Sequence, residues 1–427
     1  MTLIKSTLLA SATALVAIAG AQAADLPTKK AAPAAAYVAI CNVAGVTGFT
    51  IPGSDTCLKI SGGVGVEMIY AQRKNISAEL PGGAAQATFA NNANRFGMDG
   101  RAWLTLDTAT NTAYGPATSE AQFNFGADNA GMPTNYGNGA SLDHAWFKWA
   151  GLEGHVADGS LFNIGPNPQP TDSFGAGDIG GAAYLAYVAQ FGGGFMAGIS
   201  IEDPIGHRAA GVNGAVINPN VYAGSTVPDV AAKIGVSQGW GSAYVSGIWH
   251  QTKTIFPATA TTNGYGLAGA VSVKAGPMAT FNLSGEYSYG MAKIFSQAVG
   301  TSNLYAGGAD YVVTDVWYNA GGVAVVPKVW GISADVAITI NPQISITPYA
   351  SYGQLTYSAD PINIPKTLKG WNVGTDFTWT PVSAIAVDLN VLYTSLTESV
   401  PTAVPAGGAW NTKANGFLGR LQIKRTF

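Results

Sequence analysis

Charged side chains sit singly among apolar residues in this chain, and they are the first candidates for chemistry. Arg101 lies in the segment 95–108 and Arg420 in the segment 414–427, each between apolar or small neighbours. Successive side chains of a β-strand point to opposite faces, so such charges gather on one face and the apolar residues on the other. A charged face of this kind creates a field that attracts and orients polar solutes.

Arrangements for covalent catalysis are weak. His144 and Ser119 are the nearest Ser–His pair on neighbouring predicted strands, without the ordered third partner of a triad. We expect His144 to lie instead in the interior or at a rim. Residues 62–65, Gly-Gly-Val-Gly, lie in a strand pattern with no helix after them, which argues against a phosphate loop. We therefore predict no enzyme activity, no catalytic residue, no metal site and no cofactor. The four histidines are scattered: His144, His155, His207 and His250.

The strands that must position these charges are clearest at the end of the chain. Residues 417–427 alternate, with Phe417, Leu421, Ile423 and Phe427 on the mostly apolar parity and polar residues on the other. A frayed soluble terminus has little reason to end on an aromatic residue. A strand that faces lipid and ends in an interfacial aromatic belt has one.

The start of the chain resembles a secretory signal. Lys5 precedes an apolar stretch that ends at the small-residue tripeptide Ala21-Gln22-Ala23, so we expect cleavage after residue 23. Residues 24–36 are rich in Ala, Pro and Lys and predict a periplasmic linker. We assign 37–427 to one β-barrel domain.

Composition favours a membrane barrel over a soluble protein. Charged residues make up 11% of the chain, against about 25% in a soluble domain. Mean hydropathy is +0.18, yet beyond the signal no apolar run is long enough for a transmembrane helix. Alternating strands disperse apolar residues in this way, whereas a soluble β-sandwich or propeller should carry more surface charge. The net charge of −3 gives no case for nucleic acid as a partner.

Counting strands back from Phe427 gives 16, an even number, joined alternately by tight turns and long loops. This predicts an all-β, transmembrane antiparallel β-barrel with short periplasmic turns and long extracellular loops. The segment 291–327 is predicted as a loop with a strand-like excursion. The predicted strands are 57–72, 95–108, 117–126, 142–150, 160–165, 182–191, 194–202, 229–238, 242–251, 263–275, 279–290, 328–340, 344–355, 369–380, 384–396 and 414–427.

Assigning the apolar parity to the lipid side sends the other parity into a lumen, which in a barrel of this size holds water. Trp371, Trp379, Tyr287, Tyr289 and Phe427 then face outward near strand ends, as an aromatic girdle. Trp103 and Trp146 face inward, too few for a row along which sugars would stack. The charges that point inward are Lys59, Glu67, Arg101, Asp107, Glu120, Lys148, Lys233, Lys274, Glu286, Asp335, Asp376, Asp388, Arg420 and Lys424.

The two cysteines, Cys41 and Cys57, lie beyond the signal and flank a stretch with a plausible turn at 51–54. An oxidising compartment favours a disulfide between them, which in the chain-entropy model stabilises by about 3 kcal/mol. Two free thiols are the alternative. A metal site is disfavoured, because two cysteines without a nearby histidine supply too few ligands.

Several motifs resemble the alphaproteobacterial porin family. They are Tyr37-Val-Ala-Ile-Cys-Asn, the Cys-flanked 51–63 segment, Ser141-Leu-Asp-His-Ala-Trp-Phe147, Gly194-Phe-Met-Ala-Gly-Ile-Ser-Ile-Glu202 and the terminal Phe. The resemblance implies a trimeric outer-membrane diffusion porin whose third long loop folds into the lumen. It also implies a second long loop, about 127–141, that contacts a neighbouring subunit. This chain departs from the family in its low charge, including Ala39 where members usually carry Arg.

The inward third loop, 166–181, carries Asp172 and Asp178 and no basic residue. We expect these carboxylates to face Arg101 and Arg420 across a constriction, with Lys59, Lys424, Asp376 and Asp388 as further lumen charges. Opposed charges would orient polar solutes and disfavour apolar ones. The alternative is that each charge only solvates the lumen.

The leading functional hypothesis is passive transport of ions and small hydrophilic solutes across the bacterial outer membrane. A substrate-selective channel, for example for sugars, and a mainly structural envelope protein attached to peptidoglycan through the mature N-terminus are the alternatives. Expected partners are outer-membrane lipid, lipopolysaccharide and two further copies of the chain in a homotrimer.

Overall fold

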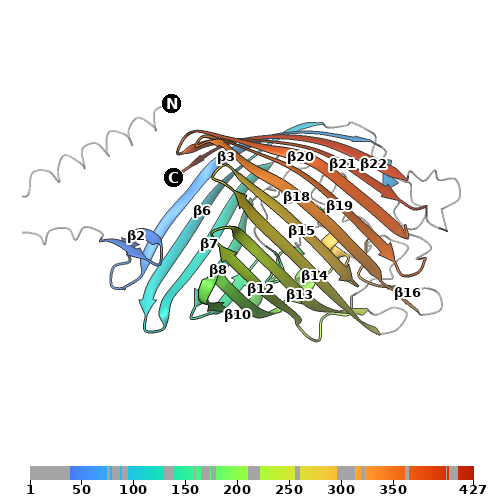
Figure 1. Cartoon of the computed structure of the whole chain (residues 1–427), viewed down its shortest axis with the longest axis horizontal. Coiled ribbons are helices and arrows are strands. Elements are labelled where there is room, and N and C mark those ends of the chain that lie inside the picture. The colour runs from blue at the N-terminus through green and yellow to red at the C-terminus, as the bar shows by residue number, and fades with distance from the viewer. Residues whose placement is uncertain are drawn as a thin grey trace, which may run out of the picture. The chain divides into compact units, whose positions relative to one another are not determined.

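A computed structural model gives the fold of the chain (Figure 1). Residues 1–40 form a unit separate from 41–427, and the second unit holds the sheet. The predicted signal peptide and linker, 1–36, lie outside the described residues, so their assignment stays a prediction. The structure describes residues 39–74, 77–78, 87–88, 95–128, 139–157, 159–164, 174, 179–209, 222–254, 260–295, 313–318, 323–360, 365–400, 402 and 412–427.

A closed antiparallel barrel of 16 strands dominates the described part of the chain. Each strand pairs with the next along the chain, and the last, β22, pairs with the first, β3. The backbones of Gly62 and Phe427 exchange two hydrogen bonds at this seam, of 3.0 and 3.2 Å. The strands are β3 (Cys57–Lys74), β6 (Phe96–Thr112), β7 (Gly115–Asp128), β8 (Gly139–Trp149), β9 (Leu152–Val156), β10 (Tyr184–Phe191), β11 (Phe195–Glu202), β12 (Asp229–Gln238), β13 (Gly241–Thr254), β14 (Ala260–Ala275), β15 (Ala279–Tyr289), β18 (Pro327–Asn341), β19 (Ile344–Tyr357), β20 (Thr367–Val382), β21 (Ile385–Glu398) and β22 (Lys413–Thr426).

The predicted strand order is confirmed, and one predicted strand is wrong. Residues 160–165 were expected to form the fifth strand, but residues 160–164 are not a strand. The fifth strand is β9, which follows a tight turn at Ala150 and Gly151, both with positive φ. The third long connection therefore runs from residue 157 to residue 183, and it begins earlier than the predicted 166–181.

Short turns join the strands at one rim and longer segments at the other. The turn between β10 and β11 is the short η1 (Gly192–Gly194), where Gly193 and Gly194 take positive φ. A Cβ on Gly194 would come within 2.0 Å of the Ser237 carbonyl oxygen, so this turn requires glycine. Such a division between turns and loops is the pattern of outer-membrane barrels.

Side chains alternate along the strands as predicted. On β20 the outward Trp371 and Trp379 are each 42% exposed, and Phe427 is 67% exposed. Trp371 contacts Tyr393 on the next strand, with ring centroids 5.5 Å apart. Exposed rings near strand ends suit the headgroup region of a bilayer.

A small hairpin precedes the barrel. Strands β1 (Ile40–Val43) and β2 (Val46–Thr50) are joined through Ala44 and Gly45, whose positive φ values fit the two-residue hairpin turn. β2 pairs with the start of β3, and a Cys41–Cys57 disulfide joins the hairpin to the first barrel strand. The predicted disulfide is confirmed.

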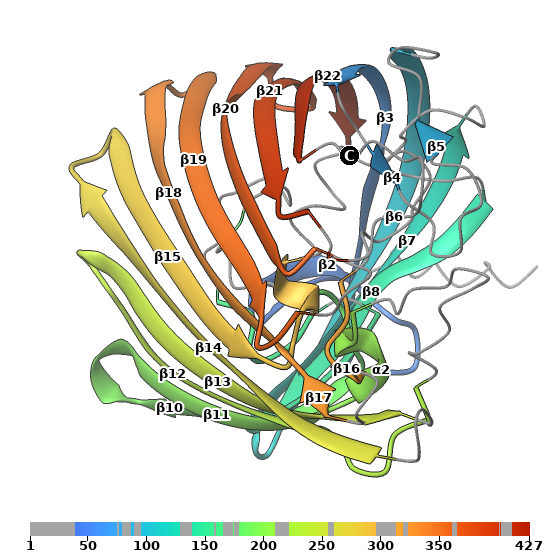
Figure 2. The same ribbon diagram turned by 90° about the vertical axis from the view of Figure 1, so that its right-hand side faces the viewer.

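Connecting segments fill part of the barrel with a hydrophobic core. Buried Phe162, Phe174 and Phe295 pack with Leu355 and Tyr357 in one cluster. Figure 2 shows α2 (Pro204–His207), β16 (Trp317–Tyr318) and β17 (Ala324–Val325) within the ring of strands. The pairing of β16 with β17 confirms the predicted strand-like excursion in 291–327. A further two-residue pair joins β4 (Ser77–Ala78) to β5 (Ala87–Thr88).

No helix in the described ranges is both long enough and apolar enough to cross a membrane.

Candidate channel-lining site

Two arginines lie on the strands that flank β3. Arg420 on β22 is opposite Ile69, and Arg101 on β6 is opposite Gly65. Arg420 Nε lies 3.3 Å from Glu67 Oε1, while the Arg101 guanidinium lies over the Trp103 ring at 5.1 Å from its centroid. The structure therefore brings Arg101 and Arg420 to one sector of the inner wall, with Glu67 of β3 between their strands.

Two lysines of the wall are paired with carboxylates. Lys424 Nζ lies 2.8 Å from Asp388 Oδ2, and Lys59 Nζ lies 3.4 Å from Asp107 Oδ2. Asp376 accepts a 2.7 Å hydrogen bond from the Asn390 side chain. Each of these charges thus lies beside an opposite charge or a hydrogen-bond donor on an adjacent strand.

The two predicted constriction carboxylates, Asp172 and Asp178, lie outside the described residues. Two described residues beside them in sequence contact β19 and the start of the same connection. The backbone N–H of Phe174 donates to Ser351 Oγ on β19 at 2.9 Å. That of Ile179 donates to Asn163 Oδ1 at 3.2 Å.

The start of the third connection is held against β11 to β13. Lys233 Nζ donates to the Asn163 carbonyl at 2.6 Å, and Ser246 Oγ donates to the Phe162 carbonyl. The Phe162 ring covers Gly266 on β14, where a Cβ would come within 3.2 Å of the ring. The apolar run at 160–164 therefore packs on the inner wall instead of joining it as a strand.

The Ser119–His144 pair is not formed. Ser119 faces outward, where its hydroxyl lies 2.7 Å from Thr108 Oγ1. His144 faces inward and contacts Glu120 Oε1 at 2.7 Å and Asp143 Oδ2 at 3.0 Å. His144 is a lumen residue, as expected, and no hydroxyl nucleophile lies at its ring nitrogens.

Inward aromatic rings on β8, β9 and β10 form a column. His155 lies parallel to Tyr184 at 4.4 Å and stacks more loosely on Trp146 at 6.4 Å between centroids. Lys148 Nζ lies 5.4 Å from the centroid of the Trp146 ring. Stacking therefore covers both faces of His155 and one face each of Trp146 and Tyr184.

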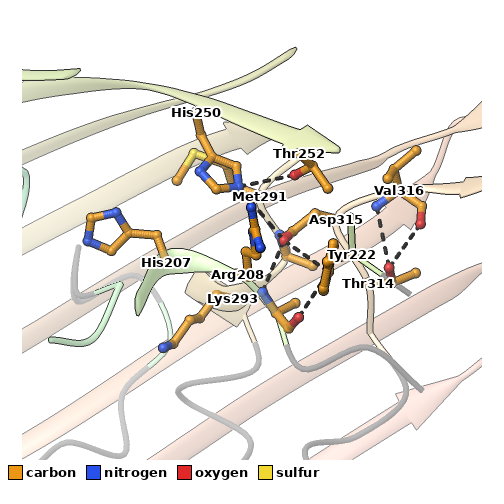
Figure 3. Close-up of polar contacts among 12 residues, drawn as sticks. His207, Arg208, Tyr222, His250, Thr252, Met291, Lys293, Thr314, Asp315 and Val316 are labelled. Carbon is orange, nitrogen blue, oxygen red and sulfur yellow. Dashed lines mark hydrogen bonds and ion pairs between the residues drawn. The ribbon is translucent and has the colours of Figure 1, made fainter. Parts of the chain in front are cut away.

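Sequence reasoning missed one cluster of buried titratable residues. Figure 3 shows His250, Asp315 and Tyr222 gathered together, with His207 to one side. Asp229 lies 2.8 Å from both His207 Nδ1 and His250 Nδ1. The contact between Asp229 and His250 could have been predicted from the sequence, because the hairpin register that pairs Val230 with Trp249 also brings Asp229 beside His250. The contribution of Asp315, from a distant connection, had no such signal.

Burial perturbs the acids of this cluster that lie in the connecting segments. Desolvation raises the pKa of the Asp315 carboxyl, and hydrogen bonds from the Ala292 and Ala209 backbones partly offset this. Desolvation, together with the nearby Asp315, also raises the pKa of Tyr222. Among the described residues no group of three or more His, Cys, Asp or Glu side chains has the geometry of a metal site.

The sequence matches the porin subfamily over residues 25–417. Among curated relatives, Porin Omp2b of Brucella neotomae is 29% identical over 380 residues, which are 84% of this chain and 96% of the relative. Porin Omp2b of Brucella abortus (strain 2308) is 27% identical over 375 residues, 82% of this chain and 92% of the relative.

Solved structures share the fold. The outer membrane channel DcaP of Acinetobacter baumannii superposes with a TM-score of 0.61 at 16% identity, covering 89% of this chain and 99% of that one. OmpT of Vibrio cholerae, in its trimer form, gives a TM-score of 0.50 at 9% identity, covering 88% of this chain and 100% of that one.

Proposed function

This chain belongs to the porin subfamily, and from that premise we infer that it is a passive channel for small hydrophilic solutes and ions across the bacterial outer membrane. The observation that carries this inference is the closed barrel with ion pairs on its inner face and exposed apolar residues on its outer face. Sixteen strands leave room for an aqueous path. The relatives are named as porins, so the function requires no catalyst.

We propose that Arg101 and Arg420 form the positive side of the constriction and that Asp172 and Asp178 of the third connection form the negative side. Supporting this, the two arginines share one sector of the wall. In addition, Phe174, which lies between the two aspartates in sequence, packs against Gly353 and Gly370 on β19 and β20, so the third connection enters the barrel interior. Lys59, Lys424, Asp376 and Asp388 would then set the potential on either side of the constriction.

Single-channel recording of purified protein in planar bilayers tests the constriction. We expect Arg101→Ala and Arg420→Ala to move the reversal potential in a salt gradient toward cation preference, and Asp172→Ala to move it toward anions. Arg425→Ala is the matched control: it is an arginine of the same strand as Arg420 on the opposite parity, bonded to the Thr426 carbonyl. Unchanged conductance and selectivity in all three lumen variants would remove these residues from the constriction.

The sugar-selective alternative is not favoured by the described aromatic residues. A sugar track needs ring faces presented to the lumen, whereas Trp146, His155 and Tyr184 turn their faces to one another. Conductance block that saturates with added sugar would support a sugar-selective channel. Flux that rises linearly with solute concentration would agree with simple diffusion.

We propose that the channel is a homotrimer that contacts lipid and lipopolysaccharide. A fold neighbour is described as a trimer, and the outward apolar residues supply a surface for lipid and for partner subunits. Cross-linking of the detergent-solubilised protein tests this, and a single uncross-linkable monomer species would exclude the trimer.

We also propose that residues 1–23 are removed and that the linker 24–36 attaches the barrel domain, 37–427, to peptidoglycan. The support is the composition of these segments. Mass spectrometry of the mature N-terminus would detect a muropeptide adduct, and an unmodified Ala24 terminus would exclude the attachment.

A further inference from the structure

A cluster of acids and imidazoles lies buried beside the ends of β11, β12 and β13, away from the charged wall described above. Glu202 is 2% exposed, and His207, Asp229, His250 and Asp315 are 0% exposed. Groups this deeply buried are retained only when each is paired, because an unpaired buried charge is costly. The channel function described above uses none of them.

Asp229 is the centre of the cluster. Its carboxylate lies 2.8 Å from Nδ1 of His207, which belongs to α2, and 2.8 Å from Nδ1 of His250, which belongs to β13. The other nitrogen of His250 lies 3.1 Å from Thr252 Oγ1 and 4.0 Å from Asp315 Oδ2. One carboxylate thus holds two imidazoles, and through His207 it holds the segment that follows β11.

Glu202 extends the cluster to the third connection. Its Oε2 lies 3.4 Å from His207 Nε2. The same carboxylate accepts hydrogen bonds from the Leu161 backbone N–H, at 3.0 Å, and from the hydroxyls of Ser160 and Ser200. The beginning of the third connection and α2 therefore share one anion.

Asp315 extends it to the segment after β15. Its carboxylate accepts from the backbone N–H of Ala209 at 3.0 Å, from that of Ala292 at 2.7 Å and from the Tyr222 hydroxyl at 3.3 Å (Figure 3). Lys293 donates to the Gly206 carbonyl, a second contact between this segment and α2.

We propose that these five residues, Glu202, His207, Asp229, His250 and Asp315, form a proton-operated latch. At neutral pH it holds the segments 159–164, 203–209, 291–295 and 313–316 on the inner wall, and in acid it releases them, so that the open channel begins to switch between conductance levels. The proposal rests on the channel function inferred above.

Electrostatics gives the direction of the effect. Glu202 of β11 and Asp229 of β12 contact His207, and Asp229 and Asp315 contact His250. Tyr222 of the 203–228 connection bonds to Asp315, and Lys293 bonds to the carbonyl of Gly206, the residue before His207. In acid, carboxyl groups are neutral and imidazoles carry a positive charge. Two buried cations would then share one site without a counter-ion, and burial of such charges is strongly unfavourable.

Asp315 has the opposite effect on the pH dependence of the latch. Because burial raises its pKa, its protonation is favourable in the folded segment. Its own contribution to stability is therefore present in acid and is lost as the pH rises through the raised pKa. The acid response of the latch must come from Asp229, Glu202 and the two imidazoles.

The first test uses the wild-type protein in planar bilayers, recorded from about pH 7 to about pH 3, a range that spans the ordinary titration of imidazoles and most of that of carboxyls. We expect steady conductance at neutral pH and a growing fraction of time in reduced or fluctuating levels in acid. A protein that forms no channel at neutral pH contradicts the proposed function. A channel that conducts equally steadily at both ends contradicts the latch alone.

The second test compares variants. His207→Gln with His250→Gln removes both imidazoles, so we expect the acid response to disappear; the single His250→Gln variant serves if the double variant does not fold. Asp229→Asn removes the shared anion, so it should begin to fluctuate at a higher pH than wild type does. His144→Gln is the matched control, because His144 also contacts two carboxylates but lies outside the cluster, and it should keep the wild-type acid response.

The third measurement separates the latch from a general effect of acid on the barrel. Hydrogen exchange at the amides of Ala209 and Ala292, corrected for the intrinsic effect of pH, should show protection at neutral pH that falls by at least tenfold in acid. Amides of the paired barrel strands should stay protected. Unchanged protection at these two amides, or a full acid response in the histidine variants, would falsify the latch.

Discussion

Two regions of the inner wall differ in what covers them. The charged wall, on β22, β3, β6, β7 and β8, carries ion pairs with partly exposed members, such as Lys59, whose side chain is 48% exposed. The packed wall, on β10 to β14, is covered by connecting segments and carries small inward residues, including Ala186, Ala231 and Ala268, each at most 4% exposed.

The difference shows that small side chains on the packed wall leave room for large side chains of the connecting segments. Phe162 is fully buried, and its ring lies over Gly266 of the packed wall. A larger inward side chain there would push the segment off, whereas the charged wall has long polar side chains and keeps water beside them. The packed wall of the barrel interior thus resembles the core of a soluble protein, whereas the charged wall keeps exposed charged side chains.

The largest expected effect comes from opening the packed wall. Phe162→Ala removes a fully buried aromatic side chain, a loss of about 3–5 kcal/mol of local packing, and should free the start of the third connection. We expect higher single-channel conductance and more current noise. Phe125→Ala is the control, because Phe125 faces outward and is 48% exposed. Equal conductance of the Phe162 variant and wild type would show that this packing does not limit the pore.

A change of intermediate size is expected at the charged wall. Glu67→Gln removes the carboxylate beside Arg420, and Glu67 is only 2% exposed. A poorly solvated charge acts strongly on its surroundings, so we expect the reversal potential to move toward anion preference. An unchanged reversal potential would mean that this pair does not contribute to the field along the path.

The pH dependence of Asp315 provides a test of the packed wall. Its raised pKa means that the folded segment favours the protonated form, so stability from this group is lost as the pH rises through that pKa. Asp315→Asn keeps a neutral side chain at every pH. We expect greater hydrogen-exchange protection of Ala292 than in wild type at neutral pH, and equal protection in acid. A difference that grows in acid would reverse the assigned direction.

The smallest effect is expected at the exposed pair on the charged wall. Asp107→Asn removes the partner of Lys59, whose side chain is half exposed. Exposed pairs contribute about 0–1 kcal/mol, and salt screens them over about 3 Å at 1 M. We expect a small shift in selectivity at low salt that vanishes at high salt. A shift as large as that of Glu67→Gln would show that exposure does not distinguish the two pairs.

Much of the barrel was predictable from alternation alone. Period-two patterns located fifteen strands, because lipid and water impose opposite demands on successive residues. The failure at 160–165 has a physical reason, because Leu161, Phe162 and Ile164 form a short apolar segment between Gly159 and Gly165, which resembles a buried strand. Their apolar side chains are buried against the wall instead, and the true strand, β9, is too short to show a pattern.

The site was predictable only in part. Parity gives the face of a residue but not what lies over it, so Arg101, Arg420 and Glu67 were predicted to point inward, while the pairing of Glu67 with Arg420 was not recognised. The five-residue latch was missed because it joins residues from β11 to β13 with Asp315, which follows them by more than sixty positions. No local sequence pattern predicts a contact between residues so far apart in the chain.

The seam between β3 and β22 has a consequence for how the chain reaches its final form. Every other barrel pairing joins strands that are neighbours along the chain, so each can form as soon as its second strand is available. The seam joins Gly62 to Phe427, and both flanking edges stay unsatisfied until the last residue is in place. Completion is therefore a single late event. Since the sheet is cyclic, a chain cut in one of the other turns and joined across Gly62 and Phe427 should build the same ring.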